Sequence, residues 1–195
     1  MPQFPSLPET AHLTDLLARF PHNVRPLMAY TTGVLRREGA LPIAARELLA
    51  AYVSGLNACS FCLGAHEIYA RELGIAPGLV AALLDDPDSA PVDDALRPIL
   101  AYARKLNTLP PRLTPADAQA VFDAGWPEEA LFEAIEVVGL FNLMNRMIEG
   151  AGVNFDYGAD ASAHTVASGD PAALADSYNV YAEKILSRAA GNGDG

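Results

Sequence analysis

The sequence predicts an all-α protein, on three observations. Apolar residues recur at helical spacing through most of the chain, prolines and glycines stand where helices would begin and end, and no segment alternates like a strand between two turns. The 195 residues are 51% hydrophobic and 19% charged, enough for a core without covalent staples. We expect a single domain over residues 1–190 and a disordered tail over residues 191–195.

The first three expected helices each have their own boundary signals. The first, residues 10–20, is indicated by leucines at helical spacing. The second, residues 23–38, has Pro26 in its first turn, where a missing N–H costs little, and it stops at Gly39. The third, residues 43–55, opens directly after a proline.

The next three helices are bounded in the same way. The fourth, residues 59–73, ends before a glycine of the kind that closes helices. A short fifth helix over residues 77–84 opens with a proline and leads into an acidic, proline-bearing surface loop. The sixth spans residues 93–107, and we expect Pro98 to kink it.

The last three helices complete the chain. Threonine followed by proline opens the helix over residues 114–125, and the longest helix, residues 127–149, ends at a pair of glycines. Asn142 and Arg146 lie one turn apart on that apolar helix, so we expect them to hydrogen-bond in the core or at a subunit contact. The final helix, residues 170–188, carries an apolar stripe that needs burial, on a partner subunit or elsewhere.

The charge balance excludes some classes of partner. Asp and Glu number 24 against 13 Lys and Arg, a net charge of -11, which would repel nucleic acid and anionic membrane surfaces. No run of 18 apolar residues predicts a membrane span, and the first residues do not resemble a signal peptide. We therefore expect a cytoplasmic protein without nucleic-acid or membrane partners.

The only two cysteines, Cys59 and Cys62, carry the main functional signal. In a reducing compartment such a pair is catalytic or metal-binding more often than structural. If Cys59 starts a helix at ~100° per residue, Cys62 and His66 share an arc of roughly 60° with it. The spacing therefore places two thiols and one imidazole on one helix face.

A fourth residue, Glu47, is expected to join this face. Residues 55–57 form a break between the third and fourth helices. If the chain reverses there, positions equally far from the turn lie opposite each other, and Glu47 comes near the His66 ring. We therefore expect a buried acidic group beside the imidazole.

Such a cluster suits the cleavage of an O–O bond. An ordinary thiol is only about 3% thiolate near pH 7, so lowering its pKa raises the reactive fraction at most ~30-fold. A general acid that protonates the departing alkoxide contributes ~10²–10⁴-fold, so the acid–base partner matters more. His66 oriented by Glu47 would supply that proton, and a second thiol would convert the sulfenic acid to a disulfide.

The order Glu47, Cys59-x-x-Cys62, His66 resembles the AhpD-like alkylhydroperoxidases of the carboxymuconolactone decarboxylase superfamily. The likeness covers residues 42–74 closely, and residues 141–146 resemble the peroxidase-related branch less specifically. The resemblance implies an all-α helical bundle built around the hairpin, without haem, metal or other cofactor, that assembles as a dimer, trimer or hexamer.

By motif position, the resemblance implies that Cys62 is the peroxidatic cysteine and Cys59 the resolving one, with Glu47 and His66 as the proton relay. It further implies a hydroperoxide substrate and a dithiol reductant of the dihydrolipoyl type. Some active members have histidine just before the second cysteine, where this chain has Phe61.

Three alternatives stay open at this point. The same cysteines could serve a disulfide oxidoreductase or redox sensor that turns over no peroxide. Glu47, Cys59, Cys62 and His66 could also form a tetrahedral zinc site. A decarboxylase-like enzyme would use the general base alone, but such relatives lack the paired cysteines.

Overall fold

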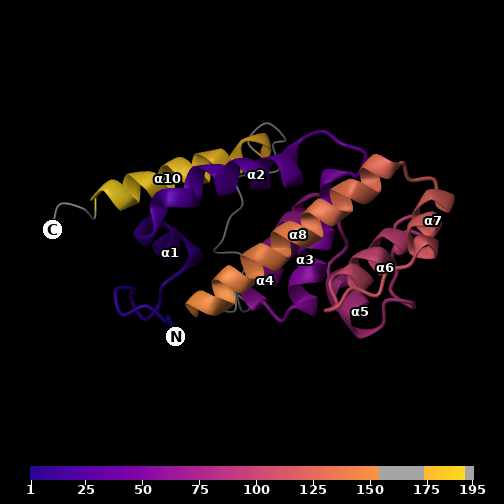
Figure 1. Ribbon diagram of the computed structural model, residues 1–195, viewed down its shortest axis with the longest axis horizontal. Helices are drawn as coiled ribbons and strands as arrows, with labels where there is room; N and C mark the ends of the chain where they lie inside the picture. Colours follow the sequence, from indigo (N-terminus) through magenta and orange to yellow (C-terminus); the bar gives the residue numbers. More distant parts are fainter. Residues whose placement is uncertain (154–173, 192–195) are drawn as a thin grey trace.

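The computed structural model describes residues 1–153 and 174–191, and over these residues it contains helices and no strands (Figure 1). The predicted all-α fold class is therefore confirmed. The elements are α1 (Leu13–Arg19), the 3₁₀ turn η1 (Pro21–Asn23), α2 (Val24–Arg36), α3 (Ile43–Leu56), α4 (Ser60–Glu72), α5 (Leu79–Asp85), α6 (Arg97–Leu106), α7 (Pro115–Asp123), α8 (Glu128–Ala151) and α10 (Ser177–Gly191). The expected disordered tail lies outside the described residues except for Gly191, which ends α10.

Helix α6 departs from the sequence prediction. A helix over residues 93–107 with a kink at Pro98 is wrong, because α6 begins only at Arg97 and Pro98 lies in its first turn. A proline there needs no hydrogen-bond partner for its nitrogen and has a φ suited to a helix start. The proline therefore starts this helix instead of bending it.

The hairpin of α3 and α4 forms the centre of the molecule. Nearly all of α3 is buried, because α4 and α8 pack on it from different sides. The hairpin turn closes α3 with a Schellman motif, in which the N–H groups of Ala58 and Cys59 donate to the carbonyls of Gly55 and Ser54. Ala58 takes the left-handed position of that motif, with a φ of 56°. The turn thereby places Cys59 at the N-cap of α4.

Helix α10 lies alongside α2 and also contacts α1 (Figure 1). Its apolar face is buried within the chain: Ile185 is fully covered, and Tyr178 and Tyr181 are half-buried. The burial expected for this face is thus provided by the protein's own N-terminal helices. The packing brings side chains from the far end of the sequence beside α4.

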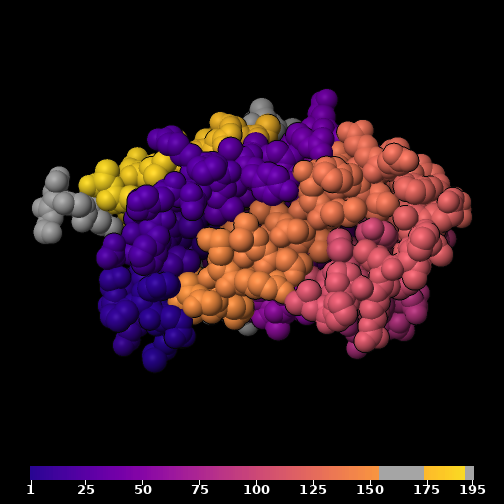
Figure 2. Space-filling model, in the orientation of Figure 1, coloured from indigo at the N-terminus to yellow at the C-terminus, as the bar shows by residue number. Residues whose placement is uncertain are grey.

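Helix α8 crosses one face of the molecule, between the N-terminal helices and α6 with α7 (Figure 2). Its inner side packs on α3, and its outer side leaves Phe132 and Leu143 exposed. Even at 24 residues it is too polar to span a bilayer, and the other helices of the described ranges likewise fail to combine the required length and apolarity.

Candidate active site

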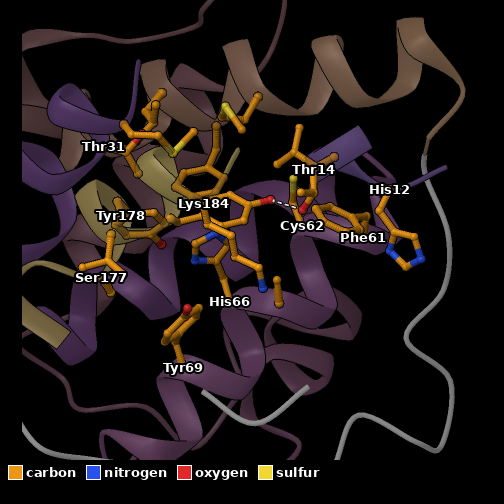
Figure 3. A pocket seen from close by; sticks show the side chains of 18 of the residues that line it. His12, Thr14, Thr31, Phe61, Cys62, His66, Tyr69, Ser177, Tyr178 and Lys184 are labelled. Carbon is orange, nitrogen blue, oxygen red and sulfur yellow. Dashed lines mark hydrogen bonds between the residues drawn. The ribbon is translucent and has the colours of Figure 1, made fainter. Parts of the chain in front are cut away.

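A cavity of about 660 Å³ lies between α4, α8, α10 and the N-terminal helices (Figure 3). Its walls are mainly apolar and aromatic. The lining side chains from α4 and α8 are Phe61, Cys62, Ala65, His66, Tyr69, Leu140, Phe141 and Met144. Such a concave, apolar space with a few polar groups is typical of a small-molecule site.

Cys62 and His66 lie one turn apart on α4 and both line this cavity (Figure 3). Each is buried but reachable: Cys62 is 3% exposed and His66 is 8% exposed. The rings of His66 and Phe141 pack edge to face with their centroids 4.5 Å apart, so the imidazole is in contact with α8. The helical spacing therefore brings one thiol and the imidazole to the same wall.

Cys59 lies at the start of α4, as the sequence predicts, but it is set apart from the cavity wall that Cys62 and His66 share. It is the N-cap of α4 and not a residue of the helix itself, it is 0% exposed, and it does not line the cavity. The turn that closes α3 uses the N–H of Cys59 and holds the residue behind Cys62. A molecule in the cavity therefore meets the sulfur of Cys62 and not that of Cys59.

The two thiols are nevertheless coupled to each other. A hydrogen bond from the Cys62 thiol lowers the pKa of Cys59, against the opposing effect of burial. The same hydrogen bond raises the pKa of Cys62, and burial raises it further. The pair therefore gives up one proton readily and retains the other.

The structure brings Glu47 and His66 together, as the hairpin symmetry predicts. His66 Nδ1 lies 2.6 Å from Glu47 Oε2, and Glu47 is 0% exposed. Burial by itself raises the pKa of Glu47, but the charge and hydrogen bonds of His66 and Arg36 outweigh it, so the pKa lies below its ordinary value. Glu47 is therefore held as a carboxylate that fixes one nitrogen of the ring.

Arg36, at the end of α2, was not found by the sequence reasoning. Its guanidinium forms a fully buried ion pair with Glu47 and lies between the rings of Tyr69 and Tyr178, at 5.0 and 4.9 Å from their centroids. Nothing in the sequence separates it from the adjacent, exposed Arg37. The only usable signal was the requirement that a buried Glu47 have a cationic partner.

Asn145 on α8 is the second residue that the sequence reasoning missed. It is buried, and its side-chain amide lowers the pKa values of both cysteines. Its neighbours Asn142 and Arg146 were noted because they share an apolar helix, and they do bond to each other. The same reasoning, that a polar group on this helix needs a partner, applied equally to Asn145.

The donor set does not favour zinc. Among residues 1–153 and 174–191, no three His, Cys, Asp or Glu side chains converge as metal ligands. The Glu47 carboxylate is directed at Arg36 and His66 instead, with one oxygen to each. The alternative of a tetrahedral site on the four candidate residues is therefore not supported by their geometry.

Comparison with known proteins gives a consistent picture. Residues 21–105, which include Glu47, both cysteines and His66, match the model of the carboxymuconolactone decarboxylase family. No curated protein matches the chain significantly. A solved peroxidase-related protein from Ralstonia eutropha JMP134, described as an alkylhydroperoxidase AhpD core, is 24% identical over 71% of this chain and 73% of its own, with a TM-score of 0.67.

Two further solved structures are similar. A peroxidase-related protein from Silicibacter sp. TM1040 is 28% identical over 65% of this chain and 66% of its own, with a TM-score of 0.61. The debrominase Bmp8, as a cysteine-to-alanine variant in complex with 2,3,4-tribromopyrrole, shares the fold at 18% identity, covering 78% and 74%, with a TM-score of 0.58. Residues 21–105 therefore resemble the carboxymuconolactone decarboxylase family, and the chain shares the AhpD-like helical fold of these peroxidase-related structures.

Proposed function

We propose that this protein is a thiol-dependent hydroperoxide reductase. The observation that carries the proposal is that Cys62 and His66 share one wall of an apolar cavity while Glu47 occupies Nδ1 of the imidazole. The other ring nitrogen, Nε2, is then the one that can exchange a proton with a molecule in the cavity. A nucleophile and a positioned proton donor are the two groups that O–O cleavage requires.

The proposed reaction balances with the groups at hand. The Cys62 thiolate attacks one peroxide oxygen, the O–O bond breaks, and the departing alkoxide takes a proton from His66 Nε2 to leave as an alcohol. Cys62 is now a sulfenic acid. The Cys59 thiol attacks that sulfur, water leaves, and a Cys59–Cys62 disulfide forms. A dithiol of the dihydrolipoyl class reduces the disulfide by exchange and is itself oxidised.

The two cysteines support these roles in different ways. Access favours Cys62 as the attacking group, because Cys59 is sealed behind it. Charge favours Cys59 as the thiolate of the resting pair. The hydrogen bond between the two sulfurs reconciles the two observations, since its proton can shift to Cys59 as Cys62 attacks.

The cavity supports an organic substrate. Its size and its aromatic walls, which include Phe61, Phe141 and Tyr178, suit an alkyl or aryl hydroperoxide better than hydrogen peroxide. Phe61, which stands where some relatives have histidine, contributes apolar surface to this wall. We further propose, on the family resemblance, that the protein is a cytoplasmic homo-oligomer.

Stopped-flow oxidation of the reduced protein tests the function. We expect cumene hydroperoxide to consume two thiols per chain, and faster than hydrogen peroxide does. Cys62→Ser should abolish the reaction, whereas Cys59→Ser should react once and retain a sulfenic acid that a dimedone probe labels. Retained reactivity in Cys62→Ser would contradict the assignment.

The sulfur–sulfur hydrogen bond also favours a second candidate, dithiol–disulfide exchange without peroxide turnover. That alternative predicts that the pair equilibrates with oxidised lipoamide but that neither hydroperoxide consumes its thiols. The stopped-flow experiment, followed by titration of the remaining thiols, separates the two functions.

A further inference from the structure

A line of side-chain amides runs from the outer surface of α8 to the cysteine pair. We call its four amide members, Asn142, Asn107, Asn57 and Asn145, the asparagine chain. It begins at Arg146, whose guanidinium donates to Asn142 Oδ1 at 2.6 Å. The subsequent Nδ2-to-Oδ1 distances are 2.7 Å to Asn107, 2.9 Å to Asn57 and 2.9 Å to Asn145.

All these hydrogen bonds point in the same direction, which Arg146 and the Val138 carbonyl fix together, because that carbonyl accepts from Asn142 Nδ2 at 2.9 Å. An asparagine amide can donate or accept, so a row of amides alone could run either way. A guanidinium can only donate, so Asn142 must present its oxygen to Arg146 and its NH₂ to the next amide. Each subsequent amide is oriented in turn, and every one donates toward the cysteines.

Asn145 is the inner end of the asparagine chain. Because Asn57 occupies its oxygen, the NH₂ group of Asn145 faces the other way and donates to Ser54 Oγ at 3.1 Å. From this position the amide lowers the pKa values of both cysteines. Asn145 is 2% exposed, so water does not compete for these contacts. An N–H that donates to sulfur favours the thiolate over the thiol.

The other charged groups around the sulfurs act differently. Glu149, one turn further along α8, opposes ionisation of both cysteines. His66, one turn from Cys62 on α4, and Tyr178 on α10 line the same cavity as Cys62. The described surroundings therefore contain an acidic group that disfavours a thiolate, and Asn145 offsets it.

We propose that Arg146 and the asparagine chain form a hydrogen-bond relay in which every group donates toward the cysteines, and that its last member, Asn145, stabilises the thiolate form of the Cys59–Cys62 pair. Asn145 is the member of the asparagine chain that acts on the ionisation of the two sulfurs, whereas Arg146 acts through the intervening amides and is a positioning residue. Aligned hydrogen bonds also polarise one another, so each upstream donor strengthens the last one. The proposal concerns the cysteine pair of the proposed function, but it does not depend on peroxide as the oxidant.

A purely structural role is the competing explanation. Asn57 and Asn107 are the C-cap residues of α3 and α6, so the asparagine chain also ties three helices together. Loss of that tie would lower stability without changing the ionisation of the thiols. The decisive measurement is therefore the apparent pKa of the pair, read from thiolate absorbance at 240 nm and from iodoacetamide alkylation against pH.

The first comparison uses the exposed end of the relay, which a substitution can remove without opening the core. We expect Arg146→Met to raise the first apparent pKa of the pair by about half a unit, and Arg146→Lys, which keeps a donor-only group, to restore most of it. Arg112→Met removes the same charge from an exposed loop and should leave the pKa unchanged. Equal shifts in the two methionine variants, or no shift in Arg146→Met, would overturn the proposal.

The second comparison uses the inner end. Asn145→Ser should raise the first apparent pKa by about one unit or more, because the amide that lowers the pKa values of both cysteines is lost. An unchanged pKa in a folded Asn145→Ser protein would also overturn the proposal. If this variant does not fold, the Arg146 and Arg112 variants still decide the question. Because no peroxide enters either measurement, the result is independent of whether the proposed function is correct.

Discussion

Nδ1 of His66 lies 2.6 Å from Oε2 of Glu47, although the two residues are 19 positions apart on opposite arms of the α3–α4 hairpin. The second carboxylate oxygen binds Arg36, so one buried acidic group holds both an arginine and an imidazole. Glu47 therefore links the packing of α2 on α3 to the orientation of the ring in the cavity wall. Changes at this residue should affect stability as well as chemistry.

Glu47→Gln should destabilise the fold strongly. The amide keeps the shape of the side chain but removes its charge, and Arg36 is left buried without a counter-ion, which costs about 3 kcal/mol. Glu183→Gln is the matched control, because it breaks an ion pair with Arg25 whose side chains are 65% and 59% exposed. That control should cost about 0.5 kcal/mol or less. Urea unfolding of both variants measures the difference, and equal losses would contradict the role given to Glu47.

The contribution of Glu47 should disappear in acid. Its pKa in the folded protein lies below the ordinary value of 4.5, so the ionised carboxylate stabilises the fold above pH 4.5 and loses that effect as the pH falls through the folded pKa. Wild type and Glu47→Gln should therefore differ fully at neutral pH and converge progressively below pH 4.5. The unfolding free energies of wild type and Glu47→Gln, measured in urea across this pH range, test this expectation. If the difference between them did not change with pH, the charge of Glu47 would not be its cause.

The arrangement of Glu47, Cys62 and His66 could be predicted because it follows from local rules. The spacing of Cys62 and His66 is one helical turn, and Glu47 reaches the ring because a hairpin pairs positions equally distant from its turn. The helices were predictable on similar grounds, since their prolines and glycines mark most boundaries. The misplaced start of α6 shows the limit, because Pro98 fits a first turn as well as a kink.

Arg36 and Asn145 could not be predicted because their roles depend on contacts distant in sequence. Arg36 is the last residue of α2 and Arg37 is its extended C-cap. The packing of α3 and α10 on α2, which buries Arg36 and leaves Arg37 exposed, is not visible in the sequence. Asn145 lies near the cysteines only because α8 packs across α3, where it bonds to Ser54, 91 positions earlier in the chain. A rule based on local spacing cannot supply such a contact.

Two glycine substitutions should change stability in opposite directions. A Cβ at Gly39 would lie 2.0 Å from Oε1 of Glu133, and this carboxylate cannot move freely because it accepts hydrogen bonds from the N–H groups of Ala40 and Leu41. We expect Gly39→Ala to cost about 1–3 kcal/mol. Gly33, inside α2, has open space around it, so Gly33→Ala should gain about 0.5–1 kcal/mol from helix propensity. Thermal unfolding of both variants checks the sign, and a tolerated alanine at residue 39 would contradict the close approach.

The reduced cysteine pair should titrate as one acidic and one resistant thiol. The hydrogen bond from Cys62 lowers the pKa of Cys59, and the coupling raises that of Cys62, so alkylation should detect one thiolate per chain forming below pH 9 and the second only in strong alkali. A comparison of Cys62→Ser with Cys62→Ala tests whether a side-chain donor at residue 62 is what lowers the pKa of Cys59. Serine still donates to the Cys59 sulfur and should keep its pKa low, whereas alanine removes the side-chain donor, so the pKa of Cys59 should be higher in Cys62→Ala than in Cys62→Ser. If both wild-type thiols titrated together near pH 9, or if the two variants behaved identically, the two sulfurs would not be coupled. The proton shift proposed to accompany attack by Cys62 would then have no basis.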